Sequence, residues 1–362
     1  VEVEWLPLSG LARIRNGKDH KSLSEGEFPV YGSGGIMRYV DTYAYNKPSV
    51  LIPRKGSLGN LFFVNVPFWT VDTIFYTEID EAQIRPKYLY YFLTTVGLGE
   101  MNQAGGVPSQ TQSVLNKLKI PIPCPDNPEK SLAIQSEIVR ILDKFTELTA
   151  ELTAELSMRK KQYNYYRDQL LSFKEDEVEG KRKTLGEIMK MRAGQHISAH
   201  NIIERKEESY IYPCFGGNGI RGYVKEKSHD GEHLLIGRQG ALCGNVQRMK
   251  GQFYATEHAV VVSVMPGINI DWAFHMLTAM NLNQYASKSA QPGLAVGKLQ
   301  ELKLFVPSIE RQIYIAAILD KFDTLTNSIT EGLPREIELR QKQYEYYRDL
   351  LFSFPKPETV SN

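Results

Sequence analysis

The segment KQYNYYRDQLLSF (residues 161–173) returns almost unchanged as KQYEYYRDLLFSF (residues 342–354), with ten of the thirteen positions identical. Apolar and aromatic residues recur in it every three to four positions, which is typical of an amphipathic helix. The two copies start 181 residues apart. A repeat at so long a period indicates that the chain contains two copies of a larger unit.

The repeat extends well beyond this segment. The matching stretches are FPVYGSGGIMRYV (28–40) with YPCFGGNGIRGYV (212–224), LIPRKGSLGN (51–60) with LIGRQGALCGN (235–245), PKYLYYFL (86–93) with NIDWAFHML (269–277), LNKLKIPIP (115–123) with LQELKLFVP (299–307), and the identical ILDKF at 141–145 and 318–322. Each half of the chain therefore consists of a globular part followed by a helix.

Two kinds of pattern predict the fold class. In the globular parts, short runs rich in Val, Ile, Phe and Tyr are separated by Gly and Pro, which predicts strands joined by tight turns, with one short helix in each part. Residues 132–173 contain neither Gly nor Pro and follow a heptad, which predicts one long helix. We expect an α+β fold in which two tandem globular domains alternate with two long helices that pair as an antiparallel coiled coil, an internal repeat with pseudo-two-fold symmetry.

The domain boundaries follow from changes in composition. We place the first globular domain at residues 1–128, the central helix at 129–174, a charged linker with the second globular domain at 175–307, the second helix at 308–354 and a tail at 355–362.

The heptad positions identify the residues expected to pair the helices or to bind a partner there. They are Leu142, Phe145, Leu152, Leu156, Tyr163, Tyr166, Leu170, Leu319, Phe322, Tyr344, Tyr347 and Leu351. In the second helix, the heptad positions of the first part also include Ile329. The heptad positions of its second part are shifted by four residues relative to the first. Gly332 and Pro334 stand at that shift, so a break is expected there. Tyr165 and Tyr346 fall outside the main seam and are left to touch a partner.

Composition excludes several classes of protein. The 362 residues carry a net charge of +1, which by itself says nothing about nucleic acid, and the three cysteines are too few and too dispersed for a disulfide framework or a thiolate zinc site. No apolar run reaches the roughly 18 residues of a membrane span, so we expect a cytoplasmic protein without a membrane partner. Neither GxxxxGK[ST] nor NPPY occurs, and Pro125-Asp126 with Glu179-Gly180-Lys181 lies partly in a charged linker. No catalytic and no metal-binding residues are expected.

The two halves of the chain are much more similar in their helices than in their globular parts. The helices are nearly the same, whereas the globular parts share only turns and strand ends. Identical surfaces suit two copies of one partner, and divergent globular parts suit two different targets. Duplex DNA offers readable major-groove faces roughly 34 Å apart, so two globular parts joined by a helical spacer fit a DNA site that is divided into two halves.

The order of parts, together with the YGSGG and FGGNG turns, the IPRKG and IGRQG loops and the tandem TAEL at 149–152 and 153–156, resembles the specificity subunit of type I restriction-modification systems. ILDKF and KQYNYYRDQLLSF are most similar to the IC subfamily. The resemblance implies two target recognition domains, each reading one half of an asymmetric bipartite DNA sequence. It also implies a non-catalytic chain without its own cofactor. Its helices set the unread gap through the number of TAEL-like units and bind two methyltransferase subunits that use S-adenosylmethionine. Restriction subunits that use ATP and Mg²⁺ join through the complex.

The best candidates for reading bases lie in two matching loops, residues 53–56 and 237–240, called here the reading loops. Arg54 and Arg238 occupy the same place, with Lys55 and Gln239 beside them. Arginine pairs with guanine and glutamine with adenine, so this difference would change base preference. A solvated turn between strands is the alternative.

Other candidates for DNA contact share a turn or a polar loop. They are Ser33 and Asn218 in the glycine turns, Arg38 and Arg221 after them, Lys18, His20 and His196 in basic runs, and Gln110, Gln112, Lys288 and Gln291 in two polar loops. Tight hairpins, a merely soluble face and loop capping are the respective alternatives. Asp72 and Glu257 also match, and we expect buried, hydrogen-bonded carboxylates rather than catalytic ones. A structural adaptor that binds two proteins is the competing function.

Overall fold

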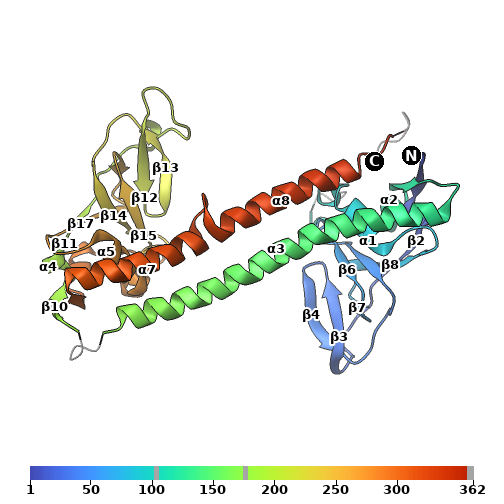
Figure 1. Cartoon of the computed structure of the whole chain (residues 1–362), viewed down its shortest axis with the longest axis horizontal. Helices are drawn as coiled ribbons and strands as arrows, with labels where there is room; N and C mark the ends of the chain where they lie inside the picture. Colours follow the sequence, from blue (N-terminus) through green and yellow to red (C-terminus); the bar gives the residue numbers. More distant parts are fainter. Residues whose placement is uncertain (102–105, 174–177, 357–362) are drawn as a thin grey trace. The chain divides into compact units, whose positions relative to one another are not determined.

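The computed structural model describes residues 1–101, 106–173 and 178–356. The chain divides into two compact units. Unit 1 comprises Val1–Leu152 with Ile337–Asn362, and unit 2 comprises Thr153–Glu336. Each unit therefore holds one globular part and portions of the long helices, with α1 (Pro86–Leu93) lying along α3 (Pro128–Leu171) in unit 1 (Figure 1).

The described residues of unit 1 form three small sheets. Their strands are β1 (Val3–Pro7), β2 (Ala12–Arg15), β3 (Glu25–Gly32), β4 (Gly35–Val40), β5 (Ser49–Pro53), β6 (Phe62–Val64), β7 (Trp69–Thr70), β8 (Ile74–Ile79) and β9 (Lys119–Pro123). The sheet orders are β1-β9, β2-β8-β5-β6 and β4-β3-β7. The short helices are η1 (Leu8–Gly10), α1, η2 (Leu98–Glu100) and α2 (Gln112–Asn116).

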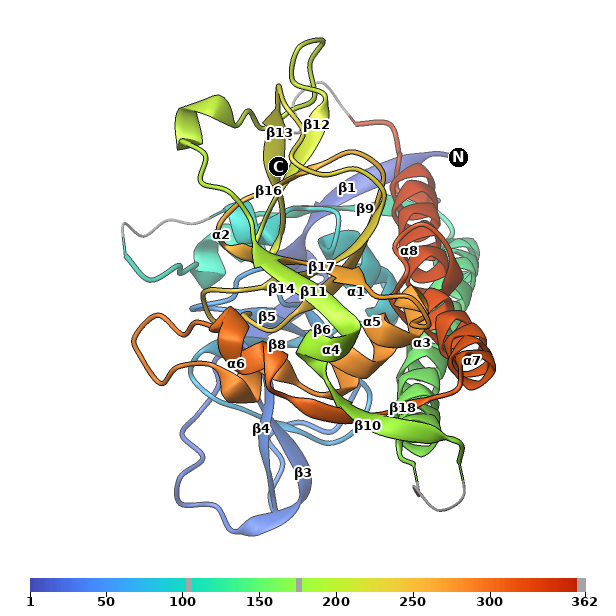
Figure 2. The same cartoon turned by 90° about the vertical axis from the view of Figure 1, so that its left-hand side faces the viewer.

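Unit 2 contains the same arrangement. Its strands are β10 (Gly180–Thr184), β11 (Met189–Ala193), β12 (Tyr212–Gly216), β13 (Gly219–Val224), β14 (Glu232–Gly237), β15 (Val246–Lys250), β16 (Tyr254–Ala255), β17 (Ala259–Val264) and β18 (Lys303–Pro307). The orders are β10-β18, β11-β17-β14-β15 and β13-β12-β16, and Figure 2 shows β10 paired with β18. The helices are α4 (Leu185–Ile188), η3 (Ala199–Asn201), α5 (Ile270–Ala279), η4 (Leu282–Tyr285) and α6 (Val296–Gln300).

The two units agree in detail. In both, the first hairpin pairs antiparallel and then adds a short parallel strand, β7 or β16. A bulge interrupts both hairpins at the same place, between Val30 and Tyr31 and between Cys214 and Phe215. The glycine after each turn, Gly35 or Gly219, has a positive φ that other residues rarely adopt. The predicted α+β repeat is therefore confirmed.

The long helices begin and end where local chemistry requires it. At the start of α3 the Asn127 side chain accepts a hydrogen bond from the Lys130 backbone N–H (3.0 Å). The second helical region is divided into α7 (Ile309–Asn327) and α8 (Gly332–Leu351), so the predicted break is confirmed. Gly332 has φ of 82°, and a Cβ there would collide with the Thr324 carbonyl.

Each unit has its own core, to which its helix segment contributes. In unit 1 the fully buried Leu142 of α3 joins a cluster with Leu8, Ile52 and Tyr88. In unit 2 the fully buried Leu319 of α7 joins a cluster with Leu234 and Trp272. Some seam residues therefore pack mainly on the globular parts, a role that the heptad alone does not indicate.

The helices also contact one another through stacked rings. Phe145 of α3 stacks on Tyr347 of α8 at 5.4 Å between ring centroids. Phe322 of α7 stacks on Tyr166 of α3 at 5.6 Å. The residue contacted on α7 or α8 has a lower number where the contacting residue of α3 has a higher one, so the helices run antiparallel, as predicted. Ile329 is 80% exposed between α7 and α8, so its seam assignment is wrong: the chain leaves the helix before that residue.

Replacing Leu142 by alanine is expected to lower the free energy of unfolding of unit 1 by about 3 kcal/mol, because it opens a cavity in the core. Urea denaturation of the purified chain measures this change. Leu350 on α8 is 54% exposed, and its alanine variant is the control, with an expected change within about 0.5 kcal/mol. Equal losses in both variants would contradict the assignment of Leu142 to the core.

Candidate nucleic-acid interface

In unit 1 the structure brings the reading loop (53–56) and the polar loop (109–112) together. The Gly56 backbone N–H donates to the Pro108 carbonyl (2.9 Å), and the Gln110 N–H donates to the Arg54 carbonyl (2.9 Å). These two hydrogen bonds hold the loops side by side. Two separate sequence candidates therefore belong to one site.

Unit 2 pairs its reading loop with the segment at 292–294, directly after the predicted polar loop, so the match of 109–112 with 288–291 is wrong: the backbone hydrogen bonds align Ser109 with Gly293. The Gly240 N–H donates to the Pro292 carbonyl (2.9 Å), and the Leu294 N–H donates to the Arg238 carbonyl (2.8 Å). Gly56 and Gly240 have φ of 82° and 90°, which explains why glycine ends each reading loop. The backbone of the site is thus the same in both units, whereas the side chains at Lys55 and Gln239 differ.

The glycine turns adjoin the reading loops. In unit 1 the Asn60 side chain donates to the Ser33 carbonyl (3.1 Å). In unit 2 the Asn245 side chain donates to the Asn218 side-chain oxygen (3.5 Å). Ser33 and Asn218 therefore belong to the same two surfaces as the reading loops.

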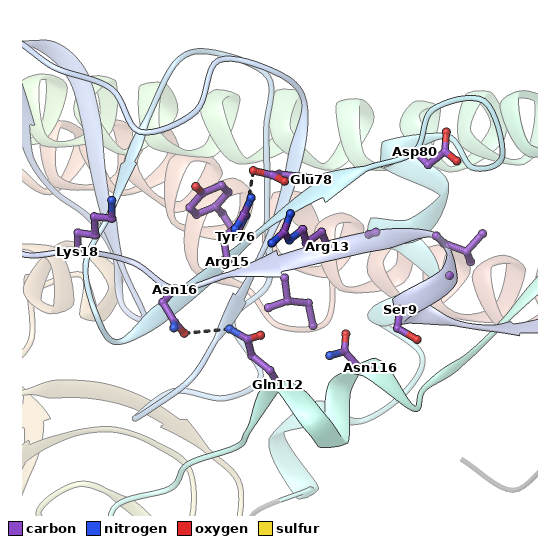
Figure 3. A pocket seen from close by; sticks show the side chains of 14 residues that line it. Ser9, Arg13, Arg15, Asn16, Lys18, Tyr76, Glu78, Asp80, Gln112 and Asn116 are labelled. Atoms are coloured by element: carbon purple, nitrogen blue, oxygen red, sulfur yellow. Dashed lines mark hydrogen bonds and ion pairs between the residues drawn. The ribbon is translucent and has the colours of Figure 1, made fainter.

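Two open cavities form a continuous polar surface in unit 1. One of about 460 Å³ is lined by Asn16, Arg54, Lys55, Phe75, Ser109, Gln110, Thr111 and Gln112. The other, of about 1050 Å³, includes Asn16 and Gln112 in its wall and extends to Arg13, Arg15 and Lys18. Gln112 donates to the Asn16 side chain (3.0 Å) where the two meet (Figure 3).

The larger cavity carries cations and a phenol. The Arg15 guanidinium pairs with Glu78 at 3.1 Å, and Figure 3 shows Arg13 and Tyr76 beside this pair. Burial, with the neighbouring Glu78, raises the pKa of Tyr76, so its hydroxyl remains a donor near neutral pH. Guanidinium, ammonium and hydroxyl donors of this kind suit phosphate oxygens.

The site of unit 2 contains a hydrogen-bond network in which only some of the residues were expected from the sequence. His258 Nδ1 lies 2.6 Å from Gln239 Oε1, and His196 Nδ1 lies 3.0 Å from Glu257 Oε1. The Arg238 guanidinium donates to the Glu257 carbonyl (3.4 Å). Partial desolvation would raise the pKa of Glu257, but the hydrogen bond with His196 and the nearby His258 lower it overall.

His258 and the role of Glu257 at the reading loop were missed. The one available signal was the match between Glu257 and Asp72, which we interpreted as two buried carboxylates. That expectation is wrong for Asp72, which lies in the turn before β8 and is exposed there. Glu257 is partly exposed, with 32% of its side chain accessible.

Several candidates have mainly local partners. The Gln110 amide is 2% exposed and donates to the Pro53 carbonyl (2.6 Å), so it supports the reading loop from beneath instead of facing a base. Arg38 donates to the Leu23 carbonyl (3.2 Å). At Lys18 it is the backbone carbonyl that accepts, from the Trp69 indole (3.0 Å), while the residue also lines the larger cavity. The remaining candidates lie at or near the surface: His20, Arg221, Lys288 and Gln291.

Two further features of the described residues bear on other functions. Within residues 1–101, 106–173 and 178–356, no group of three or more His, Cys, Asp or Glu side chains could hold a metal ion. No helix in this described part combines the length and the apolar character needed to cross a bilayer.

The sequence model of the type I restriction modification DNA specificity domain matches residues 1–158 and 177–339. The chain belongs to this family. It is 67% identical to the type I restriction enzyme EcoprrI specificity subunit of Escherichia coli, over 91% of this chain and 90% of that protein. It is 44% identical to the EcoR124I/EcoR124II specificity subunit of Escherichia coli, over 100% and 97%, and that relative belongs to the IC subfamily that the helices predicted.

Solved structures confirm the fold. The specificity subunit of a type I system from M. genitalium superposes with a TM-score of 0.67 at 17% identity, covering 99% of this chain and 97% of that one. A chain from a type I complex gives a TM-score of 0.55 at 14% identity, covering 97% of both. Its match to the family model and its identity to the two Escherichia coli subunits show that the protein is a DNA specificity subunit, a non-catalytic component of a type I restriction-modification complex. This finding decides against the structural adaptor.

Proposed function

We propose that each unit of this specificity subunit reads one half of an asymmetric, bipartite DNA sequence, with residues 1–128 and 175–307 as the two recognition domains. The observation that supports this most directly is the repeated pairing of the reading loop with a second loop, at 108–110 in unit 1 and at 292–294 in unit 2. The same backbone hydrogen bonds occur in both units, at 2.8–2.9 Å, around side chains that differ. A loop backbone that is the same in both units, with side chains that differ, suits two domains that read different DNA sequences.

The side chains suggest how each half is read. Arg54 and Arg238 suit the O6 and N7 of guanine, and Gln239 suits the N6 and N7 of adenine. His258 lies 2.6 Å from the Gln239 oxygen and fixes the orientation of the amide, which leaves its NH₂ group to donate to a base. Arg13, Arg15 and Lys18 in the neighbouring cavity would contact phosphates.

The helices would serve as spacer and docking surface. Tyr165 and Tyr346 are 61% and 64% exposed, and each lies edge-on to the next tyrosine, Tyr166 or Tyr347. The following ion pairs also match, Arg167–Asp168 at 3.0 Å and Arg348–Asp349 at 2.9 Å. Two such equal faces suit two copies of one partner.

In this proposal the partners are two methyltransferase subunits, which bind S-adenosylmethionine, and restriction subunits, which bind ATP and Mg²⁺. This chain would bind no cofactor of its own and would act in the cytoplasm, where its DNA substrate lies.

Methylation by the assembled complex tests the proposal. The specificity subunit is combined with its methyltransferase subunits and S-adenosylmethionine, incubated with random DNA, and the methylated adenines are mapped. A shared motif of two fixed halves around an unread gap is the expected result. Methylation without such a motif would refute the proposal.

A further inference from the structure

The repeated ILDKF motif places an aspartate at equivalent positions of two spacer helices. In unit 1, Asp143 of α3 accepts hydrogen bonds from the Tyr91 hydroxyl (2.6 Å) and from Lys87 Nζ (3.0 Å), both on α1. The Asp143 side chain is only 23% exposed. One carboxylate thus holds two side chains of the short helix in the first recognition domain.

In unit 2, Asp320 of α7 makes the corresponding contacts. His275 Nε2 of α5 lies 2.7 Å from Asp320 Oδ1, and the Arg248 guanidinium of β15 lies 2.6 Å from the same oxygen. The His275 side chain is fully buried. Arg248 also pairs with Asp271 (3.1 Å) and Asp323 (3.0 Å).

The two sites are copies of one arrangement. Aligning α1 with α5 on the fully buried Tyr88 and Trp272 puts Tyr91 at the position of His275. The surrounding rings follow the same repeat, because Tyr344 packs near Tyr91 at 6.3 Å between centroids and Tyr163 places its hydroxyl 3.4 Å from His275 Nδ1.

A short structural path joins each site to a reading loop. In unit 1, α1 packs on β5, and β5 ends at Pro53, the residue before Arg54. In unit 2, α5 packs on β14, and β14 ends at Gly237, the residue before Arg238. In both units, the short helix that is bonded to the aspartate therefore packs on the strand from which the reading loop starts.

We infer that Asp143 and Asp320 are positioning residues that fix each recognition domain on its spacer helix, and that only the second site responds to protons, because His275 stands where unit 1 has Tyr91. The inference rests on the proposed reading of two half-sites. Hydrogen bonds to a partly buried carboxylate are stronger and more directional than neutral ones, so they suit this role.

The proton dependence follows from the groups around His275. Its neutral form donates from Nε2 to Asp320 and accepts at Nδ1 from the Tyr163 hydroxyl, whose pKa burial raises to about 12. Burial lowers the pKa of His275 below the ordinary 6.5, and Arg248 lowers it further, against the opposing pull of Asp320 and Asp323. Burial and the bond to Asp143 raise the pKa of Tyr91, so that side chain stays protonated.

The direction of the effect follows from linkage. Because the folded protein holds His275 with a lowered pKa, the unfolded chain binds more protons as the pH falls below about 6.5. The contribution of this site to stability is therefore complete above about pH 6.5, and it is lost as the pH falls from about 6.5 through the lower pKa of His275 in the folded protein. The Asp143 site has no such group.

The test measures how strictly the complex requires its gap. The assembled methyltransferase complex is given its mapped target and versions with one base pair added to or removed from the gap. For Asp143→Ala and Asp320→Ala, the preference for the natural gap is expected to fall about tenfold. Asp143→Asn keeps an acceptor for Tyr91 and should restore most of the preference. Glu147→Ala, an exposed carboxylate on α3, is the matched control and should leave the preference unchanged.

A purely structural role predicts a different result. If the alanine variants lose methylation of all targets equally and keep the natural preference for gap length, the inference is wrong. If the unmodified complex shows no bipartite motif at all, it is instead the proposed function that fails. The two failures are therefore distinguishable in one set of experiments.

The proton dependence has its own pair of variants. At a pH well below 6.5 the natural complex should lose part of its preference for gap length, because the lowered pKa of His275 delays its protonation in the folded protein to that range. His275→Tyr should remove this dependence, and Tyr91→His should add a second one. A His275→Tyr complex with the same pH profile as the natural one would overturn this part of the inference.

Discussion

Replacing Arg54 and Lys55 together by alanine is expected to lower methylation of the natural target at least about a hundredfold, because each good contact to a base edge is worth about 1–3 kcal/mol. Arg54 and Lys55 line the open polar cavity of unit 1, and backbone hydrogen bonds between the two loops fix the main chain that carries them. Initial rates with the assembled methyltransferase complex, on DNA that carries the mapped motif, measure the loss.

Two controls separate reading from general electrostatics. Lys47 is an exposed cation before β5, and Lys47→Ala should change the rate less than about threefold. The double variant should also methylate other sequences in the first half-site no worse than the natural complex does. If the variant and the natural complex prefer the same bases, Arg54 and Lys55 do not read the sequence.

Much of the fold could be predicted because the repeat compares the chain with itself. Both hairpins, the long helix and the break before Gly332 follow from glycine, proline and apolar spacing, which are local properties. The pairing of the reading loop with the polar loop was not predictable, although both loops were candidates. It depends on hydrogen bonds such as that from Gln110 to Arg54, between residues far apart in sequence.

The same limit explains the errors at the level of side chains. Gln110 looks like a base reader from its amide, yet its 2% exposure results from the packing of two distant segments. The pairs Gln239–His258 and Asp143–Tyr91 join residues 19 and 52 positions apart. A pattern along the chain indicates which residue types are available, and only the tertiary structure indicates which of them meet.

Deleting Thr153–Leu156 is expected to abolish methylation of the natural target and to create a new one with a shorter gap. Four helical residues correspond to roughly 6 Å, and one base-pair step to roughly 3.4 Å, so the gap should shrink by one or two base pairs. Mapping the methylated adenines in random DNA measures the new gap. Both half-sites should keep their base sequences, because neither reading loop is altered.

The place of this deletion makes the result informative. Along α3 the chain passes from unit 1 to unit 2 between Leu152 and Thr153, so the deletion removes the second TAEL tetrapeptide, whose residues belong to neither core. After the deletion Leu152 takes the place of Leu156, which leaves the local sequence of the helix unchanged. Inserting a third TAEL is the converse variant and should lengthen the gap by the same amount. If both variants keep the natural gap, the spacing of the half-sites is not set by the length of this helix.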